Sequence, residues 1–448
     1  MSVPKALRAA GATAALALCA ATAVAQVGAP PQVPTDAAKR AEIVDSVCAA
    51  LNKTYVFPDV ARQMDEFVRA QLADGAYDEL PTVADLAQAL TRDLRSISHD
   101  RHLGVVYAPP DIVARMSAER DEDEIEREER EAAARANYLF KRVEILQGNV
   151  GYLRFDQFAP AEWAGPTAVA AMNFLANADA IIFDMRYNGG GSPSLIQLIT
   201  TYLLEEPTHL NSFYIRETDS TRQFWTLTHV PGPRMPDVPV YVLTSRNTFS
   251  GAEEFTYNLK NLERGTIVGD TTGGGAHPTA TVLFEHLNAA ARVPYGRAVN
   301  PISGTNWEGV GVIPDVPVPS ERALETAHVM ALTELREAET DARRQFGLDW
   351  SIAGLEAQLN PATVDPAVLA SYAGTYGPRT LTFQDGQLVY QRAPNPPMAA
   401  VPMSATLFRF EEIDYFRLEV VLDASGQPSK LVGHYDDGRT DESPRSGG

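Results

Sequence analysis

The chain has 448 residues, and its 38 lysines and arginines against 58 aspartates and glutamates give a formal net charge of -20 at pH 7. Such a surplus of acid argues against a protein that binds nucleic acid or an anionic membrane surface. The length exceeds what one hydrophobic core ordinarily serves, so we expect two or three domains.

The first 25 residues are typical of an export signal. Lys5 and Arg8 precede an apolar stretch over residues 9–21, which is too short to span a bilayer. Small residues ending at Ala25 predict cleavage after that position. We therefore expect a periplasmic or secreted protein without a membrane span. The mature chain would keep one cysteine, Cys48, which excludes an internal disulfide.

Residues 26–110 are expected to form an N-terminal helical domain. Apolar residues such as Ile43, Val47 and Leu51 recur at helical spacing along this segment. The following stretch, residues 117–134, alternates glutamate and arginine at the same spacing, which predicts a solvated helix. The functional alternative for that stretch is an acidic binding arm.

Residues 111–340 are expected to form an α/β core, because strands alternate with helices from about residue 143 onward. Short apolar runs predict its strands, at 150–155, 180–184, 238–243 and 266–269. Residues 341–365 are expected to be a linker. Short strands and turn signals over 366–448 then predict a small antiparallel β domain, which resembles the lipocalin-like appendage of secreted hydrolases.

Ser250 stands between the predicted strand at 238–243 and a helix with apolar residues at 3.6-residue spacing. A serine at such a junction lies among unpaired backbone N–H groups and at the positive end of the helix dipole. An alkoxide or oxyanion would be stabilised there. A serine that only caps a helix has the same position, so Ser250 alone does not predict catalysis.

Three other segments have unusual local chemistry. Asp184–Gly191 leads a buried strand into three glycines, whose amides can line an oxyanion hole or simply make a tight turn. Asp100–His102 contains a histidine, and Asn306–Asp315 contains Glu308 between a tryptophan and a glycine. Taken singly, the histidine and the glutamate have structural explanations too.

In this order, the four segments resemble the motifs of the tail-specific, or C-terminal processing, serine peptidases. The resemblance is to the branch of the tricorn core protease and the interphotoreceptor retinoid-binding protein, and it covers roughly residues 40–335. It implies an α/β fold class, with a spiral core of the crotonase and Clp-protease type. It also implies hydrolysis of peptide bonds in a polypeptide substrate through an acyl-enzyme, with no cofactor and no metal ion.

The resemblance also implies the roles of individual residues. Ser250 matches the nucleophile, His102 the general base and Glu308 the carboxylate that orients the base. A neutral imidazole can take the serine proton, and a carboxylate behind it fixes the tautomer. The oxyanion hole would come from backbone amides, those of Gly251 with Gly189 or Gly190.

Related bacterial processing peptidases use a lysine as base, in a loop where this chain has Gly275. The lysines after Ser250 are Lys260 and Lys430. Lys260 lies about 15 Å along the helix at 1.5 Å per residue, and Lys430 belongs to the β domain. We therefore expect no Ser-Lys pair. His277, just beyond the glycine loop, is the rival base.

The interval between His102 and Val143 shows no separate PDZ-like domain, so recognition of a free substrate C-terminus stays open. The oligomeric state also stays open. The retinoid-binding relatives imply a second function for this fold, a non-catalytic carrier of a hydrophobic ligand. The combined serine, histidine, glutamate and glycine loop favour the enzyme, because a carrier has no need for that set.

Overall fold

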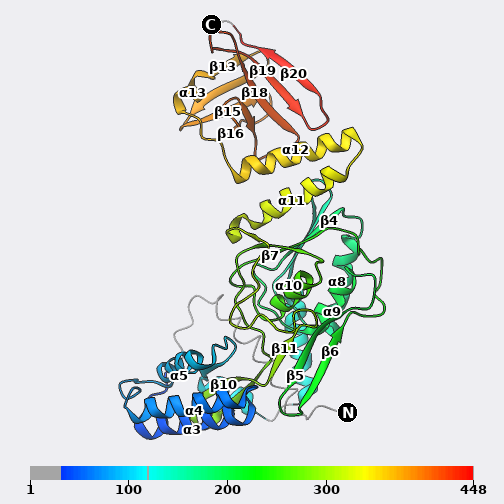
Figure 1. Cartoon of the computed structure of the whole chain (residues 1–448). Helices are drawn as coiled ribbons and strands as arrows, with labels where there is room; N and C mark the ends of the chain where they lie inside the picture. Colours follow the sequence, from blue (N-terminus) through cyan, green and yellow to red (C-terminus); the bar gives the residue numbers. More distant parts are fainter. Residues whose placement is uncertain (1–31, 119–120, 447–448) are drawn as a thin grey trace. The chain divides into compact units, whose positions relative to one another are not determined.

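The computed structural model describes residues 32–118 and 121–446, so the predicted export signal at 1–25 lies outside it (Figure 1). Two compact units are present. One holds the described residues up to Val143 with 153–177 and 183–317, and the other holds 144–152, 178–182 and the residues from Val318 onward. Because the units interleave along the sequence, the predicted domain limits stay predictions.

Three helices form the N-terminal region, as their apolar spacing predicts: α3 (Ala37–Thr54), α4 (Pro58–Ala73) and α5 (Val83–Ser98). Asp36 caps α3 by accepting a hydrogen bond from the Lys39 amide at 2.8 Å. The buried faces pack on a three-stranded sheet of order β1-β10-β9, made of Gly104–Tyr107, Ala289–Pro294 and Thr279–Phe284. Strands from late in the sequence therefore lie against this helical region.

The charged segment forms α7 (Glu122–Arg135), which has no buried residue, so the prediction of a solvated helix is confirmed. It follows α6 (Pro110–Ser117) and precedes the short turn η2 (Asn137–Leu139).

A six-stranded sheet is the centre of the α/β core. Its order is β12-β8-β7-β4-β3-β2, made of Val316–Pro317, Thr266–Gly269, Val240–Thr244, Ala180–Asp184, Val150–Phe155 and Phe140–Leu146. β7 and β4 are buried at every residue, and β7 runs parallel to β8. The helices of the core are α8 (Ala161–Phe174), α9 (Pro193–Thr201) and α10 (Gly251–Asn261).

A second three-stranded sheet, of order β11-β5-β6, was not predicted. Its strands are Gly296–Val299, His209–Ile215 and Ser220–Trp225. β6 is mostly exposed and polar, so it lacks the apolar signal on which strand prediction depends.

The second unit contains α11 (Ala323–Ala338), α12 (Ala342–Leu359) and α13 (Pro366–Ser371), after the short turn η4 (Ser320–Arg322). The predicted linker is therefore largely a helix. Local apolar spacing does not account for α12, and contacts distant in sequence stabilise it: the Arg417 guanidinium stacks 3.8 Å over the Trp350 ring, and the Trp350 indole donates to the Asp414 carbonyl at 2.8 Å.

An eight-stranded antiparallel meander, β13 to β20, ends the chain. Tyr376 of β13 bridges to Arg445, and the Ser446 amide donates to the Thr375 carbonyl at 2.8 Å, so the two edges of the sheet meet. The strands are Gly374–Tyr376, Arg379–Gln384, Gln387–Arg392, Met398–Pro402, Leu407–Arg409, Phe416–Leu422, Pro428–Tyr435 and Thr440–Pro444.

The fold class is confirmed: along the sequence, an N-terminal helical region is followed by a mixed α/β core and a C-terminal antiparallel β domain. Across residues 32–118 and 121–446, no helix combines the length and the apolar character needed to cross a bilayer.

Candidate active site

Ser250 lies in a strained turn between β7 and α10. Its backbone angles are φ 55° and ψ -121°. They match the first central residue of a type II′ turn, the mirror image of type II. Side chains of L-residues rarely tolerate this region, at a cost of about 1–3 kcal/mol. A sharp strand-to-helix turn of this kind exposes the nucleophile in other hydrolases.

The glycine loop packs directly against this turn. A methyl group on Gly190 would lie 2.8 Å from the Ser250 Cβ and 2.5 Å from the Gly251 nitrogen. No side chain fits in that space, so the close approach of the two backbones requires glycine. The structure therefore brings together the predicted nucleophile and the predicted oxyanion loop.

The amides near Ser250 differ in whether they are already bonded. Gly189 donates to the Asp156 carbonyl at 3.3 Å, and Gly190 donates to the Asn188 side-chain oxygen at 2.8 Å. Within the described part of the chain, the amides of Gly191 and Gly251 donate to no protein acceptor. Two donors next to the serine are thus free to meet a developing negative charge.

His102 is buried beside the residue that precedes Ser250. Its ring centroid lies 4.6 Å from that of Phe249. Burial lowers the pKa of His102 to about 4, which leaves the imidazole neutral at pH 7, as a general base must be. Its Nδ1 is buried without a hydrogen-bond partner among the described residues.

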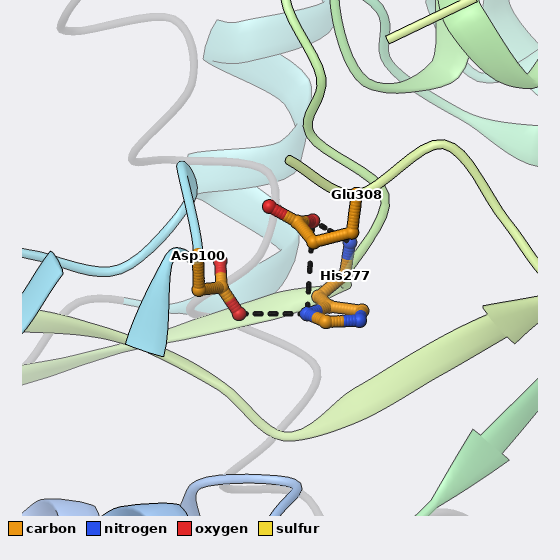
Figure 2. Close-up of side chains that lie close together, drawn as sticks. All are labelled: Asp100, His277 and Glu308. Carbon is orange, nitrogen blue, oxygen red and sulfur yellow. Dashed lines mark hydrogen bonds and ion pairs between the residues drawn. The ribbon is translucent and has the colours of Figure 1, made fainter. Parts of the chain in front are cut away.

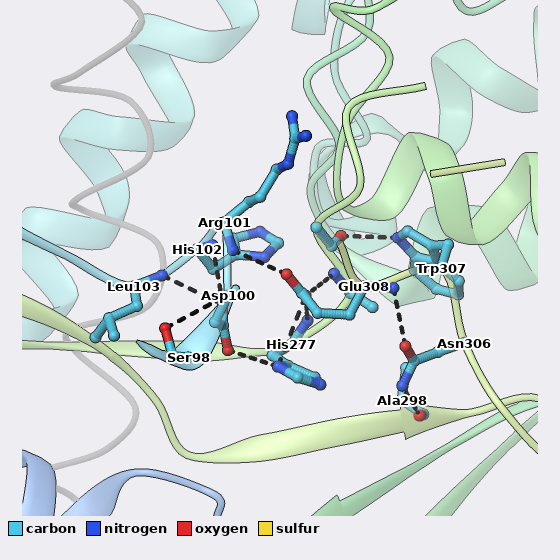
Figure 3. Close-up of polar contacts among 12 residues, drawn as sticks. Ser98, Asp100, Arg101, His102, Leu103, His277, Ala298, Asn306, Trp307 and Glu308 are labelled. Atoms are coloured by element: carbon cyan, nitrogen blue, oxygen red, sulfur yellow. Dashed lines mark hydrogen bonds and ion pairs between the residues drawn. The ribbon is translucent and has the colours of Figure 1, made fainter. Parts of the chain in front are cut away.

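Glu308 contacts the backbone on both sides of the site (Figure 3). One carboxylate oxygen accepts from the Arg101 amide at 2.9 Å, and the other accepts from the amides of Ala276 at 2.6 Å and His277 at 3.2 Å. Burial and the nearby Asp100 carboxylate raise the pKa of Glu308. The structure therefore brings Glu308 to the residue next to His102 without a hydrogen bond to the His102 ring.

The rival base, His277, has a carboxylate partner of its own (Figure 2). Its Nδ1 lies 2.6 Å from Asp100 and 3.6 Å from Glu308. The ring packs against Phe57, at 5.6 Å between centroids, whereas Phe249 packs against His102. A carboxylate therefore holds the His277 ring in place, but this ring packs against Phe57 of the N-terminal region, whereas the His102 ring packs against the residue before Ser250.

Asp100 was quoted in the sequence only as part of a motif, and the structure gives it a central position. One oxygen accepts from the amides of His102 at 3.0 Å and Leu103 at 3.3 Å. The other accepts from the Tyr55 hydroxyl at 3.3 Å and meets the His277 ring. Asp100, His277 and Glu308 are residue types that hold metals, but these hydrogen bonds already satisfy the carboxylates.

Sequence reasoning also missed Glu253. The spacing Ser250-Gly-Ala-Glu253 matches a capping box, which could have drawn attention to it. The Ser250 amide donates to the Glu253 carboxylate at 2.9 Å, and the side chain is fully buried.

Two observations bear on the expectation that Ser250 has no lysine base. The Lys260 ammonium forms an ion pair with Asp315, and a methyl group on Gly275 would lie 2.3 Å from the Phe249 ring. A side chain at this position, where related peptidases carry their lysine, would have to displace the rings of Phe249 and His102.

Two models of protein-family domains match the chain. Residues 149–318 match peptidase family S41, and residues 31–146 match the N-terminal domain of that family in eukaryotic IRBP. A carboxy-terminal-processing protease of Bartonella bacilliformis is 25% identical over 177 residues, which are 39% of this chain and 39% of the relative. The chain thus matches about two fifths of that relative's length.

Solved structures that match parts of this chain have low sequence identity to it. A peptidase structure from Parabacteroides merdae has a TM-score of 0.46 at 19% identity and covers 66% of this chain and 97% of its own. The photosystem II D1 C-terminal processing protease has a TM-score of 0.40 at 15% identity and covers 63% and 94%. With two consecutive domain models over most of residues 31–318, the chain belongs to peptidase family S41, the tail-specific serine peptidases.

Proposed function

We propose that the protein is an exported serine endopeptidase that cleaves polypeptides through an acyl-enzyme on Ser250. The strained backbone of Ser250, at φ 55° and ψ -121°, is the observation that carries this proposal. A serine that only caps a helix has ordinary extended angles and gains nothing from strain. A nucleophile gains exposure of its hydroxyl above the end of the sheet.

In the proposed reaction, the Ser250 hydroxyl attacks the scissile carbonyl carbon and its proton passes to the His102 imidazole. The tetrahedral oxyanion accepts hydrogen bonds from the amides of Gly251 and Gly191, the two that are free in this structure. The C–N bond then breaks as the imidazolium returns its proton to the leaving amine. A water molecule then attacks the acyl-enzyme by the same steps, and the product with the new carboxyl terminus is released.

Glu308 is proposed as the carboxylate that orients His102. The buried His102 Nδ1 lacks a partner, and this is the ring position at which an orienting carboxylate acts. The Glu308 carboxylate already bonds to the amide of Arg101, next to His102 in the chain. The proposal requires a Glu308–His102 contact in the substrate complex, since catalytic hydrogen bonds often tighten only in the complex.

The substrate is proposed to be an extended polypeptide. The name of the Bartonella relative describes processing at carboxy termini, which makes C-terminal segments the first candidates. The alternative function is a carrier of a hydrophobic ligand, in which Ser250 would have no reaction to perform. Export is proposed from the basic and apolar residues before Ala25, and predicts a secreted N-terminus at Gln26.

The proposal is tested by incubating purified full-length protein with a mixture of unfolded polypeptides and identifying new termini by mass spectrometry. We expect new termini with wild type and with Ser117→Ala, which removes an exposed hydroxyl elsewhere, and none with Ser250→Ala. Equal cleavage by Ser250→Ala would contradict the nucleophile assignment. Saturable binding of an apolar probe without any cleavage would support the carrier.

A further inference from the structure

Glu253 accepts four hydrogen bonds from two separate parts of the site. One carboxylate oxygen accepts from the amides of Ser250 and Gly275, each at 2.9 Å. The other accepts from the Gly274 amide at 2.6 Å and the Thr272 hydroxyl at 2.5 Å. A carboxylate has about four acceptor positions, so this side chain is fully used.

These contacts exceed what a helix cap requires. In a capping box the glutamate bonds to the amide of the cap residue, here Ser250. The other three donors belong to the loop Thr272–Gly275, which comes after β8 and lies outside the helix. Glu253 therefore ties the turn of the nucleophile to a loop distant in sequence.

That loop in turn contacts the base. A methyl group on Gly275 would lie 2.3 Å from the Phe249 ring and 2.7 Å from Cε1 of His102. The Gly275 backbone thus fills the space against which both rings rest. Through this packing, the position of Gly275 decides how close His102 stands to the segment that carries Ser250.

We propose that Glu253 is a positioning residue: its carboxylate fixes the Ser250 turn to the glycine loop and thereby fixes the separation of nucleophile and base. This inference rests on the proposed function. It assigns Glu253 an action through Ser250 and His102, without contact with the substrate.

The need for a carboxylate follows from the donor pattern. In Glu253→Gln, one oxygen becomes an NH₂ group. On one side this group would face the amides of Ser250 and Gly275, and on the other it would face the Gly274 amide. Neither orientation of the amide avoids a donor opposite a donor. Burial also raises the pKa of Glu253 to about 7, so the protein keeps this carboxylate at a cost.

Glu253→Gln is the direct test, with Glu254→Gln as its matched control. Glu254 is the next residue of α10 and is also buried. Both variants remove one buried carboxylate from one helix. Only Glu253→Gln disturbs the hydrogen bonds to the loop Thr272–Gly275.

The measurements are kcat and KM on a peptide substrate, the rate of labelling by a fluorophosphonate, and the melting temperature. For Glu253→Gln we expect kcat and the labelling rate to fall about 10²-fold, as for small displacements of reacting groups, with KM changed less than about threefold. Glu254→Gln should keep wild-type turnover per folded molecule. A folded Glu253→Gln variant with turnover within about threefold of wild type overturns the proposal.

A second pair of variants covers the case in which Glu253→Gln does not fold. Thr272→Val removes one hydroxyl donor to Glu253, and Thr272→Ser keeps it. We expect the valine variant to lose about tenfold in kcat at unchanged KM and the serine variant to match wild type. Equal kcat in both variants overturns the proposal. If wild type itself is not labelled at Ser250, the proposed function fails instead, so the two failures are distinguishable.

Discussion

Ser250 and His102 are each held in a state that costs folding free energy. The positive φ of Ser250 costs about 1–3 kcal/mol. The buried, unpartnered Nδ1 of His102 costs a similar amount, about 1–3 kcal/mol. Such costs persist only where the surrounding structure imposes them. His102 packs against Phe249, the residue before Ser250, so both costs occur in one part of the structure, which is consistent with a role in chemistry for both.

The base assignment predicts unequal effects for the two histidines. His102→Ala should lower the rate of serine acylation by about 10³ or more, as at other catalytic triads. His277→Ala should have a smaller effect, because His277 contacts Phe57 and Asp100 and not the segment of Ser250. Acylation is measured by stopped-flow with an activated ester. The reverse order of effects would assign the base to His277.

The pH dependence gives an independent test of the base. Burial lowers the pKa of His102 to about 4 from its ordinary 6.5, so the neutral ring persists as pH falls through 6. We expect the ascending limb of kcat/KM in the free enzyme to lie well below pH 6.5. Because the pKa of Glu253 is raised to about 7, the same profile is measured in Glu253→Gln. A limb at or above pH 6.5 that persists in this variant would contradict His102 as the titrating group.

Gly275 predicts a steric effect at the same site. Gly275→Ala places a methyl group 2.3 Å from the Phe249 ring and 2.7 Å from the His102 ring, so both must move. We expect kcat/KM to fall by about 10²-fold in a folded protein. Gly347→Ala is the control, because nothing lies within 4 Å of the added methyl group. Wild-type kinetics for Gly275→Ala would show that the ring positions do not matter.

At the scale of elements, α10 combines the nucleophile with two buried acids. Its first turn holds Glu253, whose carboxylate accepts from four donors, and Glu254. Acids in the first turn of a helix benefit from the helix dipole. Burial opposes that benefit and raises the pKa of Glu254 to about 7.

This shift predicts how stability changes with pH. The folded-state pKa of Glu254 lies above its ordinary value of 4.5. The contribution of this group to the free energy of unfolding is therefore fully present below pH 4.5, where the group is protonated, and is lost as pH rises through 7. Glu254→Gln should match wild type near pH 4.5 and exceed it above pH 7, by at most on the order of 3 kcal/mol. Urea unfolding at both pH values measures this. A variant less stable than wild type at pH 8 would contradict it.

Elements with strong apolar signals could be predicted from the sequence, and those with weak signals could not. The runs at 150–155, 180–184 and 266–269 are strands as expected, because each is short, apolar and flanked by turns. The hairpin of β5 and β6 was missed because β6 is polar and exposed. α12 was missed because its packing partners, such as Arg417, are distant in sequence.

The same distinction holds for the site. The four motifs could be found because each has a local signature. The network around Asp100, Glu253 and His277 could not, because its hydrogen bonds join residues up to 177 positions apart. The roles of Ser250 and His102 stay predictions until they are measured.

At the scale of the whole molecule, the candidate site and the β domain belong to different compact units. In the β domain Arg379 is fully buried, and its guanidinium bonds to Tyr390, Ser443 and Asp441. A side chain of that size and bonding is expected to contribute to the stability of its own unit.

Arg379→Met should therefore destabilise the protein by about 2–4 kcal/mol, through lost packing and the loss of the hydrogen bonds to Tyr390, Ser443 and Asp441. Arg392→Met is the control: it removes a half-exposed partner of the same carboxylate and should cost under about 1 kcal/mol. Labelling of Ser250 in the folded fraction should be unchanged in both. Loss of labelling in folded Arg379→Met would show that the β domain acts on the site.

The central claim is that Ser250 is the nucleophile, and covalent labelling tests it most directly. Full-length protein is treated with a fluorophosphonate, digested, and mapped by mass spectrometry. We predict a single modification on the peptide that contains Ser250, and no modification in Ser250→Ala. In His102→Ala, the rate of modification and the rate of peptide-bond cleavage should both fall. Modification at another residue, or full peptidase activity in protein that remains unlabelled, would contradict the account.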